Sequence, residues 1–263
     1  MKEDSVSRGM RSIARHQFIM NYLKTHKTVD VAYLCSALNV SDVTIRKDLK
    51  KLEKDNLLIR KHGGAVLNDH LFFEPSFLEK EDKFTAEKSA IAEEAAKLIK
   101  DDMTIALSTG TTVSHLLKKI KDRQLTVATN AVNVVTELMG FSNIELFLTG
   151  GQLRPNTYAL IGEAAEKSLE GIYFDYAFFG LNGFSFEQGL TTPSMEEARV
   201  VRKIIENAKH AVVLADHSKF NKVAFYRIVT VDRIQTVITD DKTPPEEIRK
   251  LRNIGINVIV AHV

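Results

Sequence analysis

The chain has 263 residues, of which 44% are hydrophobic and 27% charged, which excludes an intrinsically disordered chain and leaves room for two modest domains. No apolar run approaches the ~18 residues that cross a membrane, and the single cysteine, Cys35, excludes an internal disulfide, so we expect a cytoplasmic protein without membrane attachment. Residues 1–70 hold 13 lysines and arginines against 8 aspartates and glutamates, whereas the remainder holds 23 against 26, so a polyanion would meet the N-terminal part.

The first 70 residues predict a small helical domain that ends in a β-hairpin. Ser41 stands as an N-cap before a strongly basic stretch, and Gly63 and Gly64 mark a tight turn. The predicted elements, in order, are a helix at 13–26, a short strand at 28–31, a helix at 31–38, a basic helix at 42–56 and a hairpin at 57–67. This order of elements is typical of a winged helix-turn-helix, whose third helix enters the major groove of DNA.

The basic helix has one apolar stripe, made by Val43 or Ile45 together with Leu49 and Leu52, and cations on its other faces. We expect base contacts from the residues near its leading end, namely Ser41, Thr44 and Arg46. We expect phosphate contacts from the basic residues of the helix and hairpin, namely Lys47, Lys50, Arg60, Lys61 and His62. Taken alone, the helix is equally compatible with a solvated basic face. The complete set of elements favours double-stranded DNA.

Residues 40–67, "VSDVTIRKDLKKLEKDNLLIRKHGGAVL", resemble the DNA-binding signature of the DeoR family of bacterial transcriptional regulators. The family's run of Thr-Ile-Arg-Arg/Lys-Asp-Leu matches Thr44–Leu49, and its Arg-x-His-Gly-Gly-Ala wing matches Arg60–Ala65. Asn56 stands where the family usually has glycine, and asparagine tolerates the same left-handed backbone. The resemblance implies that this part of the chain binds a double-stranded DNA operator.

Residues 69–86 show neither helical nor strand periodicity, and they contain Pro75 and the charge run "EKED". This composition predicts a linker between two domains, and the apolar residues Phe72, Phe73, Phe77 and Leu78 predict that parts of it pack down. We therefore expect a flexible tail at 1–12, the winged helix-turn-helix domain at 13–68, the linker at 69–86 and a second domain at 87–263.

The second domain alternates short apolar runs with helical stretches. The apolar runs lie at 104–108, 125–129, 144–149, 174–180, 211–215, 236–239 and 257–260. Helical patterns between them cover 112–120, 131–139, 195–208 and 245–253. This alternation predicts an α/β fold with a largely parallel sheet that is buried on both faces.

Polar residues gather just past the carboxyl ends of these runs, where parallel sheets bind their ligands. The first run leads into "STGTT" at 108–112, which offers a glycine, a helix N-terminus and several hydroxyls. Such a turn predicts an anion site, with phosphate as the expected anion. The strand-end residues that make up the predicted site are Ser108, Thr109, Gly110, Thr111, Thr112, Thr129, Asn130, Gly150, Gly151, Arg154, Asn182, Asp216 and Lys219. Each alone is compatible with an ordinary cap or turn, but together they favour a ligand site.

The C-terminal region also resembles the effector domain of the DeoR family. The family's Asp-Ser-Gly-Thr-Thr matches Ser108–Thr112, with serine in place of the aspartate, and its Gly-Gly-x-Leu-Arg matches Gly150–Arg154. Further matches are Thr129-Asn130, Asp175–Gly180, Glu197-Ala198 and Ala215–Phe220. The resemblance implies a fold similar to ribose-5-phosphate isomerase and a phosphorylated sugar or sugar alcohol as effector. We expect "STGTT" and Lys219 to hold the phosphate, and the sugar to be read by Asn130, Arg154, Asn182, Glu197 and Asp216.

A sugar-phosphate isomerase with a DNA-binding appendage is the main alternative, and an α/β domain that only dimerises is a second one. Isomerisation needs a carboxylate base and a group that stabilises the enediolate. Asn182 cannot act as a base, no lysine lies between Gly180 and Glu196, and only Glu197 stands in a comparable place. No nucleotide-binding glycine motif or metal-ligand spacing is present in the sequence. We therefore expect no catalytic residue, no cofactor and no metal.

The sequence thus predicts a sequence-specific DNA-binding repressor of a carbohydrate-utilisation operon, which a phosphorylated sugar relieves. A single winged helix reads too few base pairs for specificity within a genome. We therefore expect a homo-oligomer, either a dimer or a tetramer.

Overall fold

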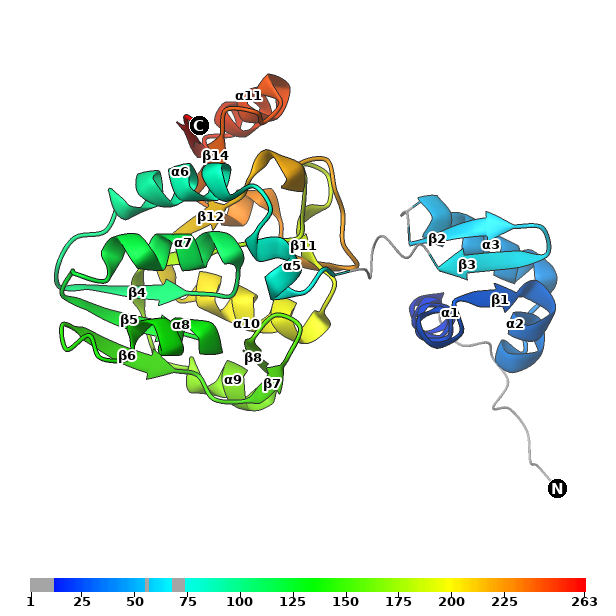
Figure 1. Cartoon of the computed structure of the whole chain (residues 1–263). Helices are drawn as coiled ribbons and strands as arrows, with labels where there is room; N and C mark the ends of the chain where they lie inside the picture. The colour runs from blue at the N-terminus through cyan, green and yellow to red at the C-terminus, as the bar shows by residue number, and fades with distance from the viewer. Residues whose placement is uncertain (1–11, 55–56, 68–73) are drawn as a thin grey trace. The chain divides into compact units, whose positions relative to one another are not determined.

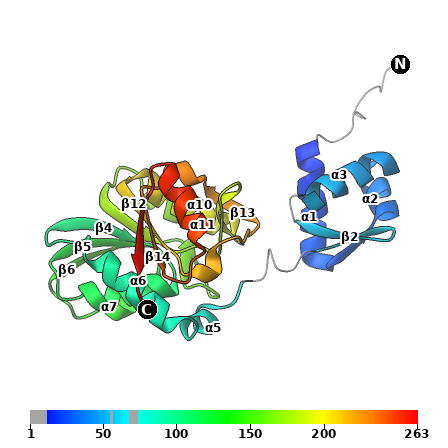
Figure 2. The same ribbon diagram turned by 90° about the horizontal axis from the view of Figure 1, so that it is seen from above.

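The computed structural model describes residues 12–54, 57–67 and 74–263. Contacts within the chain divide it into two compact units, residues 1–73 and 74–263 (Figure 1, and Figure 2 in a second view). The predicted flexible tail, apart from Ser12, lies outside the described residues, and so do Asn56, Phe72 and Phe73.

The N-terminal unit contains the predicted helices and strands in the predicted order. They are α1 (Ser12–His26), β1 (Thr28–Asp30), α2 (Val31–Leu38), α3 (Asp42–Lys54), β2 (Leu58–Lys61) and β3 (Gly64–Leu67). The three strands form an antiparallel sheet in which β3 lies between β1 and β2. The unit is therefore a winged helix-turn-helix, and β2 and β3 form its wing.

The start of α3 and its packing follow from a few residues. The hydroxyl of Ser41 accepts a hydrogen bond from the backbone N–H of Thr44 at 3.3 Å, as expected of an N-cap. Ile45, Leu49 and Leu52 are buried, whereas Val43 is 61% exposed. Of the two residues proposed to begin the apolar stripe, Ile45 is therefore the one that faces the core.

Asp48 joins α3 to α1 through buried polar contacts that sequence reasoning missed. The side chain of Asp48 is 8% exposed, and its Oδ2 accepts from Nε of Arg15 at 2.7 Å. Its Oδ1 lies 3.0 Å from Nε2 of His16. A buried carboxylate that bonds two residues of α1 fixes how α3 is presented on the surface of this unit.

Gly64 allows the wing to pair closely with β1. A Cβ atom at this position would lie 2.2 Å from the carbonyl oxygen of Val29, which is far inside van der Waals contact. Because Val29 pairs with Ala65 and Asp30 pairs with Gly64 in the antiparallel ladder, the clash cannot be relieved by moving a side chain alone. Gly64 is therefore a packing requirement of the wing, whereas Gly63 has open space around it and φ +76°, a conformation that favours glycine.

The C-terminal unit is built on one parallel sheet of seven strands, in the order β15-β14-β12-β9-β4-β5-β6. The strands are β4 (Met103–Leu107), β5 (Leu125–Thr129), β6 (Ile144–Leu148), β9 (Phe174–Phe179), β12 (Ala208–Leu214), β14 (Thr236–Asp240) and β15 (Asn257–Ala261). Each corresponds to one of the seven apolar runs. The predicted α/β fold with a largely parallel sheet is confirmed.

Helices cover both faces of this sheet (Figure 1). Side chains alternate between the faces, so that Ile105 and Leu107 pack with one group of helices and Ala106 packs with the other. The first group comprises α6 (Thr85–Ala96), α7 (Thr111–Ile120) and α8 (Val132–Leu138). The second group comprises α9 (Glu163–Ser168), α10 (Met195–Glu206) and α11 (Pro245–Asn253).

Shorter elements at the edges of the unit were not predicted. They are α5 (Phe77–Glu81), the hairpin of β7 (Gln152–Arg154) and β8 (Ala159–Ile161), and a small antiparallel sheet of β10 (Gly183–Ser185), β11 (Gly189–Thr192) and β13 (Tyr226–Val229). Two single-turn helices lie at His217–Lys219 and Val231–Arg233. The predicted linker at 69–86 differs from the structure, because residues from Glu74 onward belong to the α/β unit.

Two features are absent from residues 12–54, 57–67 and 74–263. No helix in these ranges has the length and apolar character needed to cross a membrane. No group of three or more histidine, cysteine, aspartate and glutamate side chains in them could hold a metal ion.

Candidate functional site

A cleft of about 630 Å³, including its open mouth, lies where several strands of the large sheet end. Seven of the predicted site residues line it, namely Thr109, Gly110, Thr111, Thr112, Asn182, Glu197 and Lys219. Four further polar residues of the lining were not predicted, namely Glu74, Lys80, Thr157 and Thr192.

One wall of the cleft is the turn between β4 and α7. Gly110 is the N-cap residue of α7 and has φ +145°. The first backbone N–H groups of a helix have no partner within the helix, and the helix dipole is positive at this end. Thr111 and Thr112 are buried in the same turn and line the cleft. The turn therefore offers backbone N–H and hydroxyl donors, together with the positive potential of a helix N-terminus, to an anion.

Two lysines bring positive charge to the same cleft. Nζ of Lys219 lies 3.9 Å from Oδ2 of Asp216. Burial lowers the pKa of the Lys219 ammonium group. Lys80, in α5, lines the cleft as well. Because burial disfavours the charged form of Lys219 even beside Asp216, an anion bound here would stabilise that charged form further.

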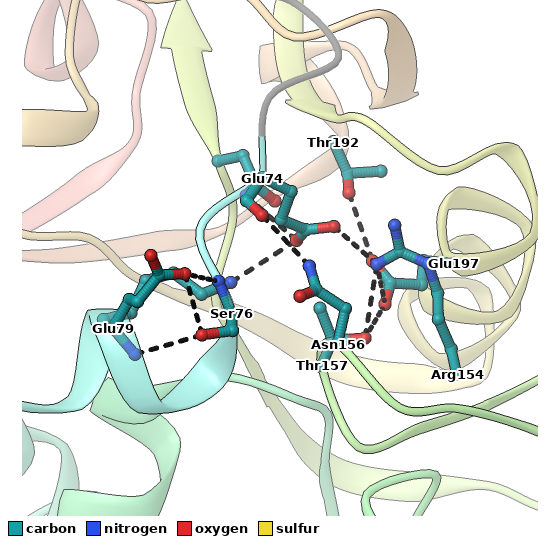
Figure 3. A network of polar contacts seen from close by, with 10 residues as sticks. Glu74, Ser76, Glu79, Arg154, Asn156, Thr157, Thr192 and Glu197 are labelled. Carbon is teal, nitrogen blue, oxygen red and sulfur yellow. Dashed lines mark hydrogen bonds and ion pairs between the residues drawn. The ribbon is translucent and has the colours of Figure 1, made fainter. Parts of the chain in front are cut away.

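Arg154 and Glu197 form the centre of a polar network (Figure 3), in which Glu197 lines the cleft and Arg154 lies outside the lining. Nη1 of Arg154 donates to Oε1 of Glu197 at 3.2 Å, and the hydroxyl of Thr157 donates to the same oxygen. The hydroxyl of Thr192 donates to Oε2 of Glu197 at 3.4 Å. Burial, followed by the nearby charge of Glu74, raises the pKa of Glu197. These groups can bind hydroxyls as donors and as acceptors.

Three predicted site residues lie beneath the cleft and support it. The hydroxyl of Ser108 donates to Oδ1 of Asn130 at 3.1 Å, and Nδ2 of Asn130 donates to the carbonyl oxygen of Leu160 at 3.3 Å. The hydroxyl of Thr129 donates to the carbonyl oxygen of Leu107 at 2.7 Å. All three side chains are buried. Ser108, which replaces the family's aspartate, therefore bonds to Asn130 and is not part of the lining.

The remaining predicted residues also lie outside the lining. Gly150 and Gly151 form the turn between β6 and β7. Asp216 caps the single-turn helix at His217–Lys219, because its Oδ1 accepts from the N–H of Ser218 at 2.9 Å. Its Oδ2 is buried and has no hydrogen-bond partner among the described residues.

The predicted DNA-contacting residues lie together on the N-terminal unit, and seven of the eight are exposed, the exception being half-buried Thr44. Arg46 is 53% exposed and forms two hydrogen bonds with Asp42, one of them from Nη2 to Oδ2 at 3.2 Å. The hydroxyls of Ser41 and Thr44 lie 2.9 Å apart. Lys47 and Lys50 are exposed on α3, and Lys61 and His62 are exposed at the tip of the wing. The residues predicted to read bases and to bind phosphates therefore lie on one helix and its wing.

Glu74 and Lys80 are the functional candidates that sequence reasoning missed. One signal was available, because Ser76 and Glu79 form a capping box in which each side chain bonds the backbone N–H of the other residue. The pattern Ser-x-x-Glu predicts the start of a helix. It would have placed Lys80 on α5 and Glu74 just before it.

Two family models together match most of the chain. Residues 15–70 match the DeoR-like helix-turn-helix domain, and residues 83–241 match the DeoR C terminal sensor domain. The chain belongs to the DeoR family. It is therefore a DNA-binding transcriptional regulator with a sensor domain, and the isomerase alternative is set aside.

Curated relatives of the DeoR-family chain match it over nearly their whole length. The HTH-type transcriptional repressor GlcR of Bacillus subtilis is 35% identical over 84% of this chain and 86% of its own length. The HTH-type transcriptional regulator GolR of Listeria innocua is 33% identical over 94% of this chain and 98% of its own length. The glycerol-3-phosphate regulon repressor of Escherichia coli K12 is 32% identical over 89% and 93%.

Solved structures resemble the chain only distantly. Ribose 5-phosphate isomerase A from Methanocaldococcus jannaschii matches with a TM-score of 0.38 and 22% identity, covering 51% of this chain and 53% of that one. The eIF2B beta subunit from Chaetomium thermophilum matches with a TM-score of 0.40 and 13% identity, and the match covers 59% of this chain and 49% of that one.

Proposed function

We propose that this DeoR-family regulator represses a carbohydrate-utilisation operon, and that a phosphorylated sugar or sugar alcohol bound in the cleft relieves the repression. The turn at Thr109–Thr112 carries this proposal, because its helix N-terminus and hydroxyls line the same cleft as two lysines. Phosphate is the anion that such a combination of donors and charge binds. A relative that is a glycerol-3-phosphate regulon repressor supports the same class of operon.

In the proposed binding mode, the turn and the two lysines hold the phosphate, and the polar network holds the sugar. Asn182, Glu197 and Thr192 line the part of the cleft next to Arg154. Asn130 and Asp216, which we expected to contact the sugar, would act indirectly, by supporting the turn and Lys219. Glu197 would orient a hydroxyl and would not move a proton, since the proposal requires no chemical step.

On DNA, we propose that α3 enters the major groove and that the wing contacts phosphates. Arg46 has to leave Asp42 to reach a base edge, which makes its contribution depend on the correct sequence. Arg46→Ala should therefore weaken binding to the specific site more than binding to random DNA. Lys50→Ala is the matched control, because loss of a phosphate contact weakens both and reduces the log–log salt slope by about 0.9. Equal losses with Arg46→Ala would assign Arg46 to the phosphate backbone.

We propose that the working unit is a homo-oligomer, a dimer at least, located in the cytoplasm. A two-fold protein should prefer inverted repeats whose half-sites lie about one helical turn apart. Analytical ultracentrifugation of the full chain with a half-site duplex tests this. A monomer bound to a single half-site with full affinity would contradict it.

The effector part of the proposal is tested by a thermal-shift screen of sugars and sugar alcohols in phosphorylated and unphosphorylated pairs. A ligand that binds only the folded protein raises Tm by mass action. We expect a shift only with phosphorylated compounds. Lys219→Met should abolish the shift, whereas Lys167→Met, which removes an ammonium that is 65% exposed on α9, should preserve it. A shift that survives in Lys219→Met would place the phosphate elsewhere.

A further inference from the structure

Glu74, the first described residue of the α/β unit, places its carboxylate inside the cleft (Figure 3). Its side chain is only 3% exposed. Oε2 accepts from Nη1 of Arg154 at 2.5 Å, and Oε1 accepts from Nδ2 of Asn182 at 3.1 Å and from Nζ of Lys80 at 3.4 Å. A buried carboxylate held by two cations and an amide is bound in the way that an anionic ligand is bound.

The cations and carboxylates of the cleft balance while Glu74 is present. Lys80, Lys219 and Arg154 supply the positive charge. Glu74, Glu197 and Asp216, which lies 3.9 Å from Nζ of Lys219, supply the negative charge. A phosphate monoester adds about 1.5 to 2 negative charges near neutral pH. With Glu74 in place, the phosphate would meet three carboxylates that already match the three cations, and without Glu74 one of these cations would be left for the phosphate. A phosphorylated ligand and Glu74 should therefore compete for the cleft.

The backbone next to Glu74 is held by a single residue of the turn between β7 and β8. Nδ2 of Asn156 donates to the carbonyl oxygen of Glu74 at 3.0 Å. The carbonyl oxygen of Asn156 accepts from the N–H of Phe77 at 2.8 Å. Residues 74–77, which we call the strap, are thus fastened by the Glu74 carboxylate on one side and by Asn156 on the other. Loss of the carboxylate contacts would leave the strap held through Asn156 and through the buried ring of Phe77, which packs against Tyr158 with ring centroids 5.2 Å apart.

We propose that Glu74 is a tethered competitor of the effector, and that the strap leaves the cleft when the effector binds. This inference rests on the proposed effector site. The wing ends at Leu67, and residues 68–73 are all that separates it from the strap in the chain. In this proposal, the conformation with the strap in the cleft binds the operator, and the conformation with the strap out of the cleft binds the effector. Each ligand then weakens the binding of the other through the same equilibrium.

Removal of the competitor should strengthen effector binding. If Glu74 occupies the cleft nine-tenths of the time, only about a tenth of the molecules can bind the effector, and the apparent Kd is about tenfold higher than the intrinsic value. Glu74→Gln removes the charge and keeps the size of the side chain, so it should lower the apparent Kd about tenfold. Asn156→Ala should act in the same direction through the backbone of the strap. Both variants should bind operator DNA more weakly when no effector is present.

Calorimetric titration of the full chain tests this with inorganic phosphate, D-ribose 5-phosphate, D-glucose 6-phosphate and sn-glycerol 3-phosphate as probes. Asp82→Asn is the matched control, because it removes an exposed carboxylate at the end of α5. Tighter binding of at least one probe by Glu74→Gln, with Asp82→Asn equal to wild type, would support the competitor. Equal or weaker binding of every probe by Glu74→Gln would overturn it, and weaker binding would make Glu74 a ligand contact.

Hydrogen exchange distinguishes this inference from the proposed function. With a bound probe, the peptide that contains the Phe77 amide should exchange faster in wild type, because its bond to Asn156 opens. Slower exchange would overturn the release of the strap while leaving the effector site intact. If neither wild type nor Glu74→Gln binds any phosphorylated probe, the effector site itself is refuted, and the competitor with it.

Discussion

Two substitutions of Gly110 test the proposed phosphate site, because Gly110→Ala adds only backbone strain and Gly110→Asp adds the same strain and a negative charge. Gly110 has φ +145° and ψ 144°, a conformation that residues with a side chain rarely adopt. A side chain there costs about 1–3 kcal/mol of stability. An added Cβ would lie 3.8 Å from Cα of Gly180 and from Cγ2 of Val113, so the atom itself has room. Gly110→Ala should therefore lower the free energy of unfolding by about 1–3 kcal/mol without adding charge.

Gly110→Asp adds the same strain and a carboxylate beside the bound phosphate. Two like charges about 4 Å apart repel each other by about 1 kcal/mol in water and about 4 kcal/mol near a protein surface. This repulsion corresponds to a Kd for the sugar phosphate that is roughly fivefold to a thousandfold higher. Circular dichroism melting should give similar Tm values for the two variants. Calorimetry should show that Gly110→Asp binds the sugar phosphate at least fivefold more weakly than Gly110→Ala, and equal affinities would refute the placement of the phosphate at this turn.

Three further predictions concern parts of the chain outside the cleft. Asp48→Ala should lower the free energy of unfolding of the N-terminal unit by about 1.5–3 kcal/mol in urea denaturation, since it removes charge-assisted hydrogen bonds to Arg15 and His16. An unchanged midpoint would contradict this. Gly64→Ala should abolish operator binding in anisotropy titrations and leave the melting of the α/β unit unchanged, because its Cβ would collide with the carbonyl oxygen of Val29; wild-type affinity would show that the wing tolerates the change. Burial lowers the pKa of Lys88 to about 8, from 10.5, so the unfolded chain binds more protons between these values and stability rises with pH there. The free energy of unfolding of wild type relative to Lys88→Met should therefore increase by about 3 kcal/mol from pH 8 to pH 10.5, and a constant difference would count against a buried ammonium.

The parallel sheet could be predicted because its strands are buried on both faces. Such strands appear as short continuous apolar runs, as in Ile105–Leu107, whose side chains alternate between two groups of helices. The N-terminal unit could be predicted because its signals are local, as with the Ser41 cap that bonds a residue three positions later. The small sheet of β10, β11 and β13 was missed, because its strands have three or four residues and no repeating pattern.

The site could be predicted only in part, because several of its contacts join residues far apart in the chain. Glu74 bonds to Arg154 and Asn182, which are 80 and 108 positions away, and no local pattern specifies either contact. Strand-end residues were predicted as one set, although the fold divides them. Thr109 and Lys219 line the cleft, whereas Thr129 turns its hydroxyl to the backbone of the neighbouring strand. The direction in which a side chain points after a strand depends on the turn, and the turns were not predictable from composition.

The central claim is that a phosphorylated sugar bound in the cleft controls the affinity of this regulator for DNA. The most direct measurement is the Kd of the full chain for a duplex that it has itself selected from a random library, with and without the compound that raises Tm most. We predict that the saturating phosphorylated compound raises this Kd at least tenfold, and that its unphosphorylated counterpart leaves it unchanged. The same Kd with and without the phosphorylated compound, or an equal effect of the unphosphorylated sugar, would contradict the account.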